Sequence, residues 1–237
     1  MKKQKNHSEI YKIDGVGVNL ERFHPLPSSE KNTLRTEKGL SPNDFILMYT
    51  AEFIPRKNHK FLFDMLPDLK AKIPSLKIVL CGKGRFLEHF KNYAVQNKMN
   101  YVVFTGYTKE VAVWCGISDV LVMPSFQEGL PLSMIEAVAT GLPVVASNVR
   151  GHQDVIEDGM NGFLCDLNRP EDFIRCITLL YKNPALRQEM GRRNVGVAKR
   201  FSLGEILPRM EKIYREMMQL HGPLTTPAGR KPPPKRR

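Results

Sequence analysis

The feature that most constrains the fold is the alternation of short apolar runs with longer segments of mixed character. The apolar runs cover residues 45–50, 76–81, 101–105, 119–123, 143–147 and 163–166. They are apolar along most of their length rather than at every second position, which is typical of parallel strands buried on both faces. The segments between most of them are long enough to return across a sheet as helices. The pattern therefore predicts an α/β fold built as a doubly wound parallel sheet.

The rest of the chain divides into helices and flanking regions. Helices are expected at about 30–40, 59–72, 85–96, 109–116, 131–140, 152–157, 170–181 and 184–200, several of them started by proline or stopped by glycine. Residues 13–27 are interpreted as a connector that pairs with nothing downstream. The domain thus spans 13–200, followed by an amphipathic helix at 201–220. A basic segment at 1–12 and a basic, proline-rich tail at 221–237, expected to be disordered, flank them.

The positive charge of the chain is concentrated at its two ends. The formal net charge is +12, of which residues 1–12 contribute +3 and residues 221–237 contribute +5. A basic tail can contact anionic lipid or nucleic acid, but a solvated tail is the simpler interpretation. We therefore expect no nucleic-acid partner.

The spacing of the cysteines and the length of the apolar runs indicate the cellular compartment of the protein. The cysteines at 81, 115, 165 and 176 lack metal-ligand or redox spacing, which favours buried thiols in a reducing, cytoplasmic environment. The sequence contains no run of 18 apolar residues that would predict a membrane span, and no apolar core of a signal peptide follows the basic start.

Polar and glycine residues follow each of the first four apolar runs. They are Arg56 and Lys57, Gly82 and Gly84, Gly106 and Tyr107, and Glu128. Because the carboxyl ends of parallel strands meet at one edge of a sheet, these residues are expected to converge there. Ligands of doubly wound sheets bind at that edge, so it is the predicted site.

Residues 125–136 carry the most specific signal. Pro131 suits the first position of a helix, whose next backbone amides would be free to bind a phosphate. These are the amides of Leu132, Ser133 and Met134. Glu128 in the loop and Glu136 in the helix flank this anion site. Two carboxylates suit hydroxyl groups on either side of a phosphate, so the stretch predicts a nucleotide-sugar with its diphosphate between ribose and hexose.

Other phosphate-binding and catalytic patterns are absent from the sequence. The Gly-Lys-Gly at 82–84 is no dinucleotide fingerprint, because Leu87 stands where a third glycine is required, and there is no P-loop. A glycosidase would need the two glutamates to flank a bond as acid and nucleophile, whereas here they are placed for hydroxyl recognition. Metal-ligand spacing is also absent, so we expect neither a metal nor an organic cofactor.

These features together resemble the C-terminal half of retaining GT-B glycosyltransferases of the large family four (group 1), of the type that builds bacterial exopolysaccharides and capsules. The resemblance rests on the 128–136 glutamate pair, the Lys57 loop, Gly-Lys-Gly at 82–84 and Gly-Leu-Pro-Val-Val-Ala-Ser at 141–147, and covers residues 13–220. It implies a Rossmann-like domain that binds a UDP- or GDP-sugar, with UDP-hexose favoured. The hexose would pass to a polysaccharide or lipid-linked acceptor, and the latter would bring the protein to the inner face of the membrane.

The resemblance also implies roles for single residues. Glu136 would accept hydrogen bonds from the ribose and Glu128 from the hexose. Lys57 would stabilise the charge of the departing diphosphate, so Lys57 and Glu128 are the expected catalytic residues. The backbone around the diphosphate would come from Gly129, Leu130, Pro131, Leu132 and Ser133. Gly82 and Gly84 would complete the donor site, and Gly106 would lie near the base. Transfer would retain the anomeric configuration, with the leaving phosphate assisting the acceptor.

Two departures from the family pattern matter. Members often carry Gly-Arg where this sequence has Ala51-Glu52, and Arg56 is our hypothesis for the second cation on the diphosphate. Members also have an N-terminal domain that holds the acceptor, before the position of residue 13. The resemblance therefore implies a fragment of a longer protein or one subunit of a split transferase whose partner supplies that half. A degenerate remnant is the third explanation.

Two function classes follow. The first is an enzyme, and the alternative is a non-catalytic sugar-nucleotide-binding half. A nonhydrolysing sugar epimerase is a more distant third candidate. The last helix bears on partners, because an apolar stripe recurs every three or four residues at Ile206, Met210, Ile213, Met217 and Leu220. The stripe packs onto its own domain in the simpler interpretation. In GT-B enzymes this helix crosses to the first domain, so part of the stripe is expected to be exposed and to mediate association.

Overall fold

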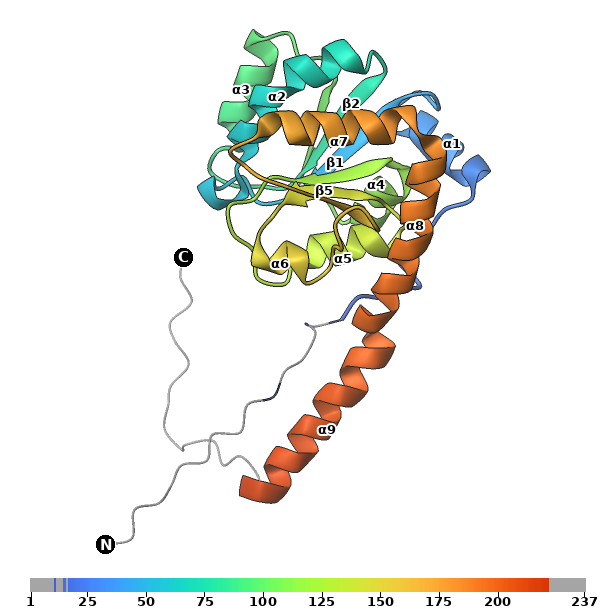
Figure 1. Cartoon of the computed structure of the whole chain (residues 1–237), viewed down its shortest axis with the longest axis vertical. Helices are drawn as coiled ribbons and strands as arrows, with labels where there is room; N and C mark the ends of the chain where they lie inside the picture. The colour runs from blue at the N-terminus through green and yellow to red at the C-terminus, as the bar shows by residue number, and fades with distance from the viewer. Residues whose placement is uncertain (1–10, 12–14, 16, 222–237) are drawn as a thin grey trace, which may run out of the picture.

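The computed structural model of the chain describes residue 11, residue 15 and residues 17–221. Helices and strands alternate as predicted (Figure 1). The strands are β1 (Phe45–Thr50), β2 (Leu76–Cys81), β3 (Val102–Gly106), β4 (Val120–Met123), β5 (Val144–Ser147) and β6 (Gly162–Cys165). The α-helices are α1 (Ser28–Glu37), α2 (His59–Lys72), α3 (Leu87–Gln96), α4 (Val111–Ile117), α5 (Leu132–Ala139), α6 (Arg150–Gln153), α7 (Pro170–Lys182), α8 (Pro184–Ala198) and α9 (Leu203–His221). Apart from residues 11 and 221, the predicted basic segment and tail lie outside the described residues.

The strands form one parallel sheet in the order β3-β2-β1-β4-β5-β6. Leu47 of β1 is in register with Ile78 of β2 on one side and with Val120 of β4 on the other. The central strands are buried along their length, as their continuous apolar character predicts, whereas the edge strand β3 is only half-buried. The predicted doubly wound, Rossmann-like α/β fold is confirmed.

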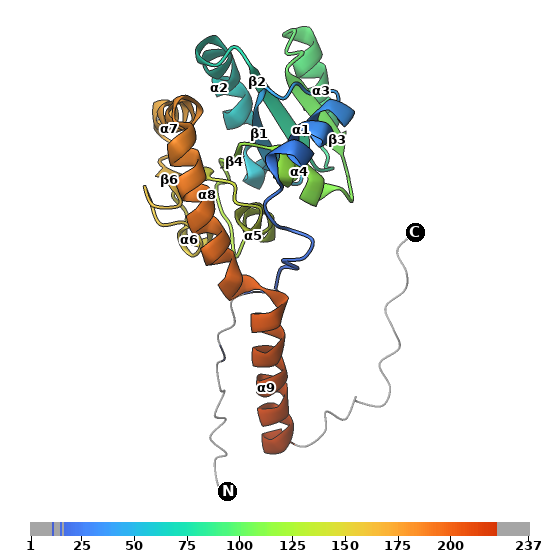
Figure 2. The same ribbon diagram turned by 90° about the vertical axis from the view of Figure 1, so that its right-hand side faces the viewer.

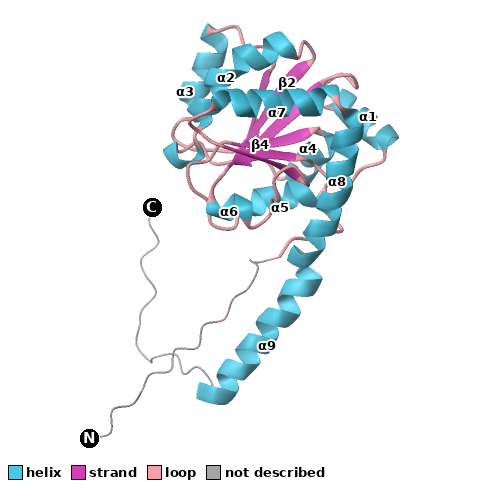
Figure 3. Ribbon diagram, in the orientation of Figure 1, coloured by secondary structure: helices cyan, strands magenta, loops and turns pink. Residues whose placement is uncertain are grey.

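Helices cover both faces of the sheet. From β1 the chain passes through α2 and α3 toward the β3 edge, and from β4 it passes through α5 toward the β6 edge. Right-handed crossovers in opposite directions place these helices on opposite faces. α7 contacts α2, while α4 and α8 contact α5. Figure 2 shows α2 and α7 on one side of the strands with α1 and α4 on the other, and Figure 3 shows α7 lying across the sheet.

Element boundaries differ from the prediction in small, explicable ways. The fourth strand begins at Val120 rather than at Asp119. The Asp119 carboxylate accepts from the Ile46 amide (2.9 Å) and from the Arg35 guanidinium (2.7 Å). α6 is much shorter than the helix predicted at 152–157. The chain turns there toward β6, and the Asn161 side chain accepts from the Glu157 amide at 2.8 Å.

The connector is paired with the domain, which contradicts the prediction that it pairs with nothing downstream. Val18 forms a parallel bridge with Ser202. The Val18 amide donates to Phe201 (2.8 Å), and the Leu203 amide donates back to Val18 (2.9 Å). Val18 and Phe23 are buried in the core. The alternation of Val16, Val18 and Leu20 is compatible with a short strand, but it does not identify Ser202, 184 positions away, as the partner.

α9 extends away from the body of the molecule (Figures 1 and 2). Ile206 in its first turn is fully buried, whereas Tyr214, Met217 and Met218 are exposed. The simpler interpretation, that the stripe packs onto its own domain, therefore holds only at the start of the helix. The side chain of Leu220 lies outside the described residues, and association through this helix stays a prediction.

Candidate functional site

The centre of the predicted site is the point where the direction of the sheet changes. β1 and β4 are neighbours, but the chain leaves them toward opposite faces. In doubly wound sheets, ligands bind beyond the carboxyl ends of the strands at such a point. Two segments line this place: residues 51–58, called here the β1 loop, and residues 124–131, called the β4 loop.

The β1 loop brings Arg56 and Lys57 to this edge. Its short 3-10 turn η1 (Pro55–Lys57) is started by proline, whose fixed φ suits a first helical position. The turn ends at Asn58, which has a left-handed backbone (φ 54°) and precedes the first residue of α2. Asparagine is one of the few non-glycine residues that adopts this conformation readily. Lys57 therefore lies immediately before a sharp change in the direction of the backbone.

Lys57 and Glu128 form an ion pair between the two loops. The distance from Lys57 Nζ to Glu128 Oε1 is 2.5 Å, and the two side chains are only 13% and 5% exposed. Arg56 lies 3.3 Å from the other carboxylate oxygen and donates to the Gln127 carbonyl at 3.0 Å. The structure therefore brings the three predicted residues together. It pairs both cations with the glutamate, which the sequence analysis did not predict.

The ion pair controls the protonation of Glu128. Burial alone would raise the pKa of its carboxyl, but hydrogen bonds from Lys57 and Ser125 lower this pKa below its usual value. Glu128 is therefore a carboxylate at neutral pH. A carboxylate of this kind accepts hydrogen bonds, including those of a sugar hydroxyl.

The start of α5 differs from the prediction by one residue. Pro131 is the residue before the helix rather than its first residue, because its ψ of 100° is extended. The Met134 amide, predicted to be free, donates to the Pro131 carbonyl at 3.0 Å. Helix geometry still leaves Leu132 and Ser133 without an intrahelical acceptor, and proline has no side chain to cap them. Leu130 packs against Gly15 of the connector.

Glu136 lies inside α5, as predicted. Burial raises the pKa of its carboxyl, and attraction to the Arg22 guanidinium partly opposes this shift. Arg22 also donates to the Lys109 carbonyl at 2.6 Å. The sequence analysis missed Arg22, because it belongs to the connector and lies 114 positions before its charged neighbour.

The glycines after β2 have a packing role that needs no ligand. A Cβ at Gly82 would lie 1.9 Å from the Ala51 carbonyl oxygen, and one at Gly84 would lie 2.6 Å from the Phe53 nitrogen. Both glycines therefore let the β1 loop pass close to the end of β2. The contact of Gly82 and Gly84 with a donor stays a prediction. Gly106 is the last residue of β3 rather than part of the following loop, and its place near the base also stays a prediction.

Four buried polar residues connect the strand ends, and the sequence analysis assigned no role to any of them. They are Tyr49, Ser125, Ser147 and His152. His152 Nδ1 lies 2.8 Å from the Ser147 carbonyl, and burial lowers the pKa of its imidazole. The only available signal was a polar residue at the end of an apolar run, as at Ser125 and Ser147. Such a residue is more often a simple strand terminus.

Gly151 lets α6 pack closely against the β4 loop. A Cβ at this position would lie 1.6 Å from the Gly129 carbonyl oxygen and 2.7 Å from the Glu128 carbonyl oxygen. Only glycine permits this approach, so the loop after β5 supports the backbone that carries Glu128.

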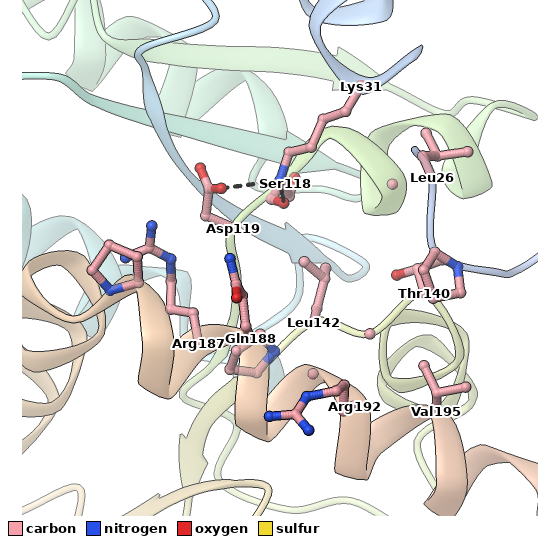
Figure 4. Close-up of a pocket in the computed structure, with 16 residues that line it drawn as sticks. Leu26, Lys31, Ser118, Asp119, Thr140, Leu142, Arg187, Gln188, Arg192 and Val195 are labelled. Atoms are coloured by element: carbon pink, nitrogen blue, oxygen red, sulfur yellow. Dashed lines mark hydrogen bonds and ion pairs between the residues drawn. The ribbon is translucent and has the colours of Figure 1, made fainter. Parts of the chain in front are cut away.

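A cavity of about 470 Å³ lies at the opposite edge of the sheet (Figure 4). Asp119 and Pro143, which precede β4 and β5, line it together with Arg187 of α8. Lys31 donates to the Ser118 carbonyl (2.7 Å) and to Asp119 (3.0 Å) in its wall. This cavity is at the amino ends of the strands, and none of the residues predicted for the donor site lines it.

Within the described part of the chain, no helix is both long and apolar enough to cross a membrane. Residues 30–195 match the family described as glycosyl transferases group 1. The chain belongs to this family. The matched segment contains both loops and both glutamates, and the group 1 family is the one that the sequence analysis named.

Relatives and solved structures agree with this assignment. The chain is 35% identical over 218 residues to the putative glycosyltransferase EpsD of Bacillus subtilis, covering 92% of this chain and 57% of that protein. It is 27% identical to the Escherichia coli UDP-Gal:alpha-D-GlcNAc-diphosphoundecaprenol alpha-1,3-galactosyltransferase, covering 85% of this chain and 53% of that protein. The chain thus spans little more than half of either relative.

Two solved structures show the same fold. HepE from Anabaena, in complex with UDP-glucose, has a TM-score of 0.75 and 21% identity, covering 84% of this chain and 56% of that one. The C-terminal domain of the group 1 protein LpcC from Francisella tularensis has a TM-score of 0.69 and 19% identity, covering 79% of this chain and all of that one. The predicted correspondence to a C-terminal GT-B domain is confirmed.

Proposed function

We propose that this chain is the donor-binding half of a glycosyltransferase and that its donor is a nucleotide diphosphate-sugar, with UDP-hexose the first candidate. The observation that carries the proposal is the Lys57–Glu128 pair, which lies at the switch point of the sheet in a chain of the group 1 family. The structures of HepE in complex with UDP and with UDP-glucose support the choice of nucleotide.

Donor binding would exchange the partners of this ion pair. A diphosphate carries more negative charge than a carboxylate, so it competes for the Lys57 ammonium. Glu128 then loses its cation and needs new hydrogen-bond donors, which the hydroxyls of the hexose supply. In this scheme Lys57 stabilises the charge of the leaving diphosphate, and the amides of Leu132 and Ser133 at the start of α5 add to that stabilisation.

The remaining predicted contacts complete the donor site. Glu136 accepts hydrogen bonds from the ribose, and Arg56 follows Lys57 to the diphosphate once Glu128 turns to the sugar. Gly106 lies near the base. Amides and cations hold the diphosphate in this scheme, so it requires no metal. Transfer goes to a polysaccharide or lipid-linked acceptor with retention of configuration.

The second candidate is a binding half that does not turn over its donor alone. The observation in its favour is that the chain spans 57% and 53% of the two relatives described above. An N-terminal GT-B domain, in the same polypeptide or a partner subunit, would then supply the acceptor and complete the cleft.

Calorimetric titration with uridine, UDP, GDP, UDP-glucose and GDP-mannose tests the proposal. Lys57→Met is expected to weaken UDP and UDP-glucose but not uridine, whereas Glu136→Gln weakens all three uridine ligands. Glu128→Gln is expected to weaken UDP-glucose more than UDP. Lys60→Met is the matched control, because Lys60 is exposed and pairs with Asp64. A folded chain that binds none of these ligands would refute the proposal. Donor binding without hydrolysis, with turnover restored by an N-terminal domain, would favour the second candidate.

A further inference from the structure

One phenol hydroxyl connects the β1 loop to the β4 loop. Tyr49 is the fifth residue of β1 and is fully buried. Its hydroxyl lies 2.6 Å from the Lys57 carbonyl oxygen and 3.1 Å from Ser125 Oγ. Lys57 and Ser125 are 68 positions apart in the sequence, and both belong to segments that carry the proposed donor residues.

Counting protons gives the direction of each bond. The Lys57 carbonyl can only accept, so the Tyr49 hydroxyl donates to it. Burial raises the pKa of Tyr49, so the phenol keeps that proton. The single proton of Ser125 can then go to the Tyr49 oxygen or to the Glu128 carboxylate, whose pKa this hydroxyl helps to lower. Ser125 is therefore a donor shared between the phenol and the proposed hexose ligand.

Ser125 is also held from the other side. The Ser147 hydroxyl donates to the Ser125 carbonyl at 2.5 Å. His152 Nδ1 lies 2.8 Å from the Ser147 carbonyl and must carry a proton there, because a carbonyl only accepts. A buried chain of hydrogen bonds thus runs from α6 through the ends of β5 and β4 to β1, and it ends at the backbone of Lys57.

Packing alone does not account for a tyrosine at this position. Its ring lies among buried aromatic groups, with the His59 ring centroid at 4.9 Å, and phenylalanine would fill the same space. The hydroxyl adds a buried polar atom, which destabilises a core unless its hydrogen bonds are made. Here those bonds fall on the two loops that must hold an ammonium and a carboxylate at a fixed spacing.

Building on the proposed function, we propose that Tyr49 is a positioning residue of the donor site. Its hydroxyl holds the Lys57 backbone against the start of the β4 loop. The ammonium of Lys57 therefore meets the diphosphate while Glu128 meets the hexose. Tyr49 itself contacts neither group. Positioning of this kind keeps the binding groups in the geometry that the ligand requires, whereas the same residues bind poorly when they are displaced.

Tyr49→Phe in the full chain tests the inference, with affinity for uridine, UDP and UDP-glucose as the readout. We expect about tenfold weaker UDP-glucose binding, about the effect of one lost hydrogen bond, and unchanged uridine binding. Tyr101→Phe is the control, because it removes the hydroxyl of another buried tyrosine, which directly precedes β3 at the opposite edge of the sheet. It is expected to leave all three affinities unchanged. Ser125→Ala breaks the same connection from the other loop and serves if Tyr49→Phe folds poorly.

A double-mutant cycle separates positioning from general weakening of the fold. In a Lys57→Met background, Tyr49→Phe is expected to have no further effect on UDP binding, because no ammonium remains to be positioned. Additive losses in the cycle, equal loss of uridine affinity, or UDP-glucose affinity unchanged in Tyr49→Phe would each overturn the inference. If the parent chain binds no nucleotide, the proposed function fails first, and that result is distinguishable from all of these.

Discussion

Lys57→Met tests the energetics of the central ion pair. The variant leaves the Glu128 carboxylate, with a side chain only 5% exposed, without its closest cation. Removing one partner of a buried pair costs about 3–5 kcal/mol. Arg56 remains 3.3 Å from the other oxygen, although it is 44% exposed and well screened. Because Arg56 still compensates part of the charge, we expect a loss at or below the lower end of this range, about 2–3 kcal/mol of unfolding free energy.

The loss has a defined pH dependence. In the parent protein the pKa of Glu128 is lowered, so its stabilising contribution is present above the carboxyl pKa of the unfolded chain, about 4.3. That contribution disappears as the pH falls through the lower folded value. Without Lys57, burial is the main influence and raises the folded pKa above the unfolded one. The variant therefore loses stability as the pH rises through that range, so its deficit relative to the parent is smaller at pH 4 than at pH 7.

Urea unfolding between pH 4 and 7.5 measures the unfolding free energies on which this prediction depends. The proteins compared are the parent, Lys57→Met, Glu128→Gln and the double variant. The double variant is expected to recover most of the loss, because no unpaired charge stays buried. Lys60→Met, which breaks an exposed pair, should change the unfolding free energy by less than about 0.5 kcal/mol. A Lys57→Met protein as stable as the parent at pH 7.5, or a deficit that does not vary with pH, would refute the reasoning.

Four further predictions concern the fold, the support of the site and the exposed helix α9. Gly151→Ala places a Cβ 1.6 Å from the Gly129 carbonyl oxygen, so we expect weaker UDP-glucose binding and a loss of about 2 kcal/mol in urea unfolding. Gly196→Ala, with open space around it in α8, should instead stabilise the fold by up to about 1 kcal/mol. Arg35→Met removes hydrogen bonds to three backbone carbonyls and one carboxylate, and thermal unfolding should show a loss of about 3 kcal/mol. Met218→Lys should reduce the concentration-dependent self-association expected of α9 in sedimentation, and identical behaviour of parent and variant would contradict that expectation.

The fold was predictable because its signals are local. An apolar run such as that of β1 or β4 indicates a buried strand whatever surrounds it, and proline and glycine mark the helix ends. The edge that carries the site followed from the same reasoning, because parallel strands bring their carboxyl ends together. This is why Lys57 and Glu128, 71 positions apart, were expected in one place and lie in one place.

What the sequence could not predict depends on contacts between distant segments. The pairing of Val18 with Ser202 joins segments 184 positions apart, and neither segment indicates its partner. Ser125 and His152 look like a strand terminus and a helix cap until the fold buries them together. The pairing of Lys57 with Glu128 also has no sequence signature, since the same residues would suit an open site with separated charges.

The bridge between Val18 and Ser202 joins the connector to the segment that directly precedes α9, and the two segments form a joint there. α9 has 19 residues, so it is a lever about 28 Å long that leaves the domain at this joint. A rotation of about 10° there would carry its far end about 5 Å while the six strands stay unmoved. The two backbone hydrogen bonds that link Val18 with Phe201 and Leu203 lie at this joint, and the buried Ile206 holds the first turn of α9 beside it. Such a rotation would therefore displace the exposed side chains of Tyr214, Met217 and Met218 relative to the domain that carries the proposed donor site.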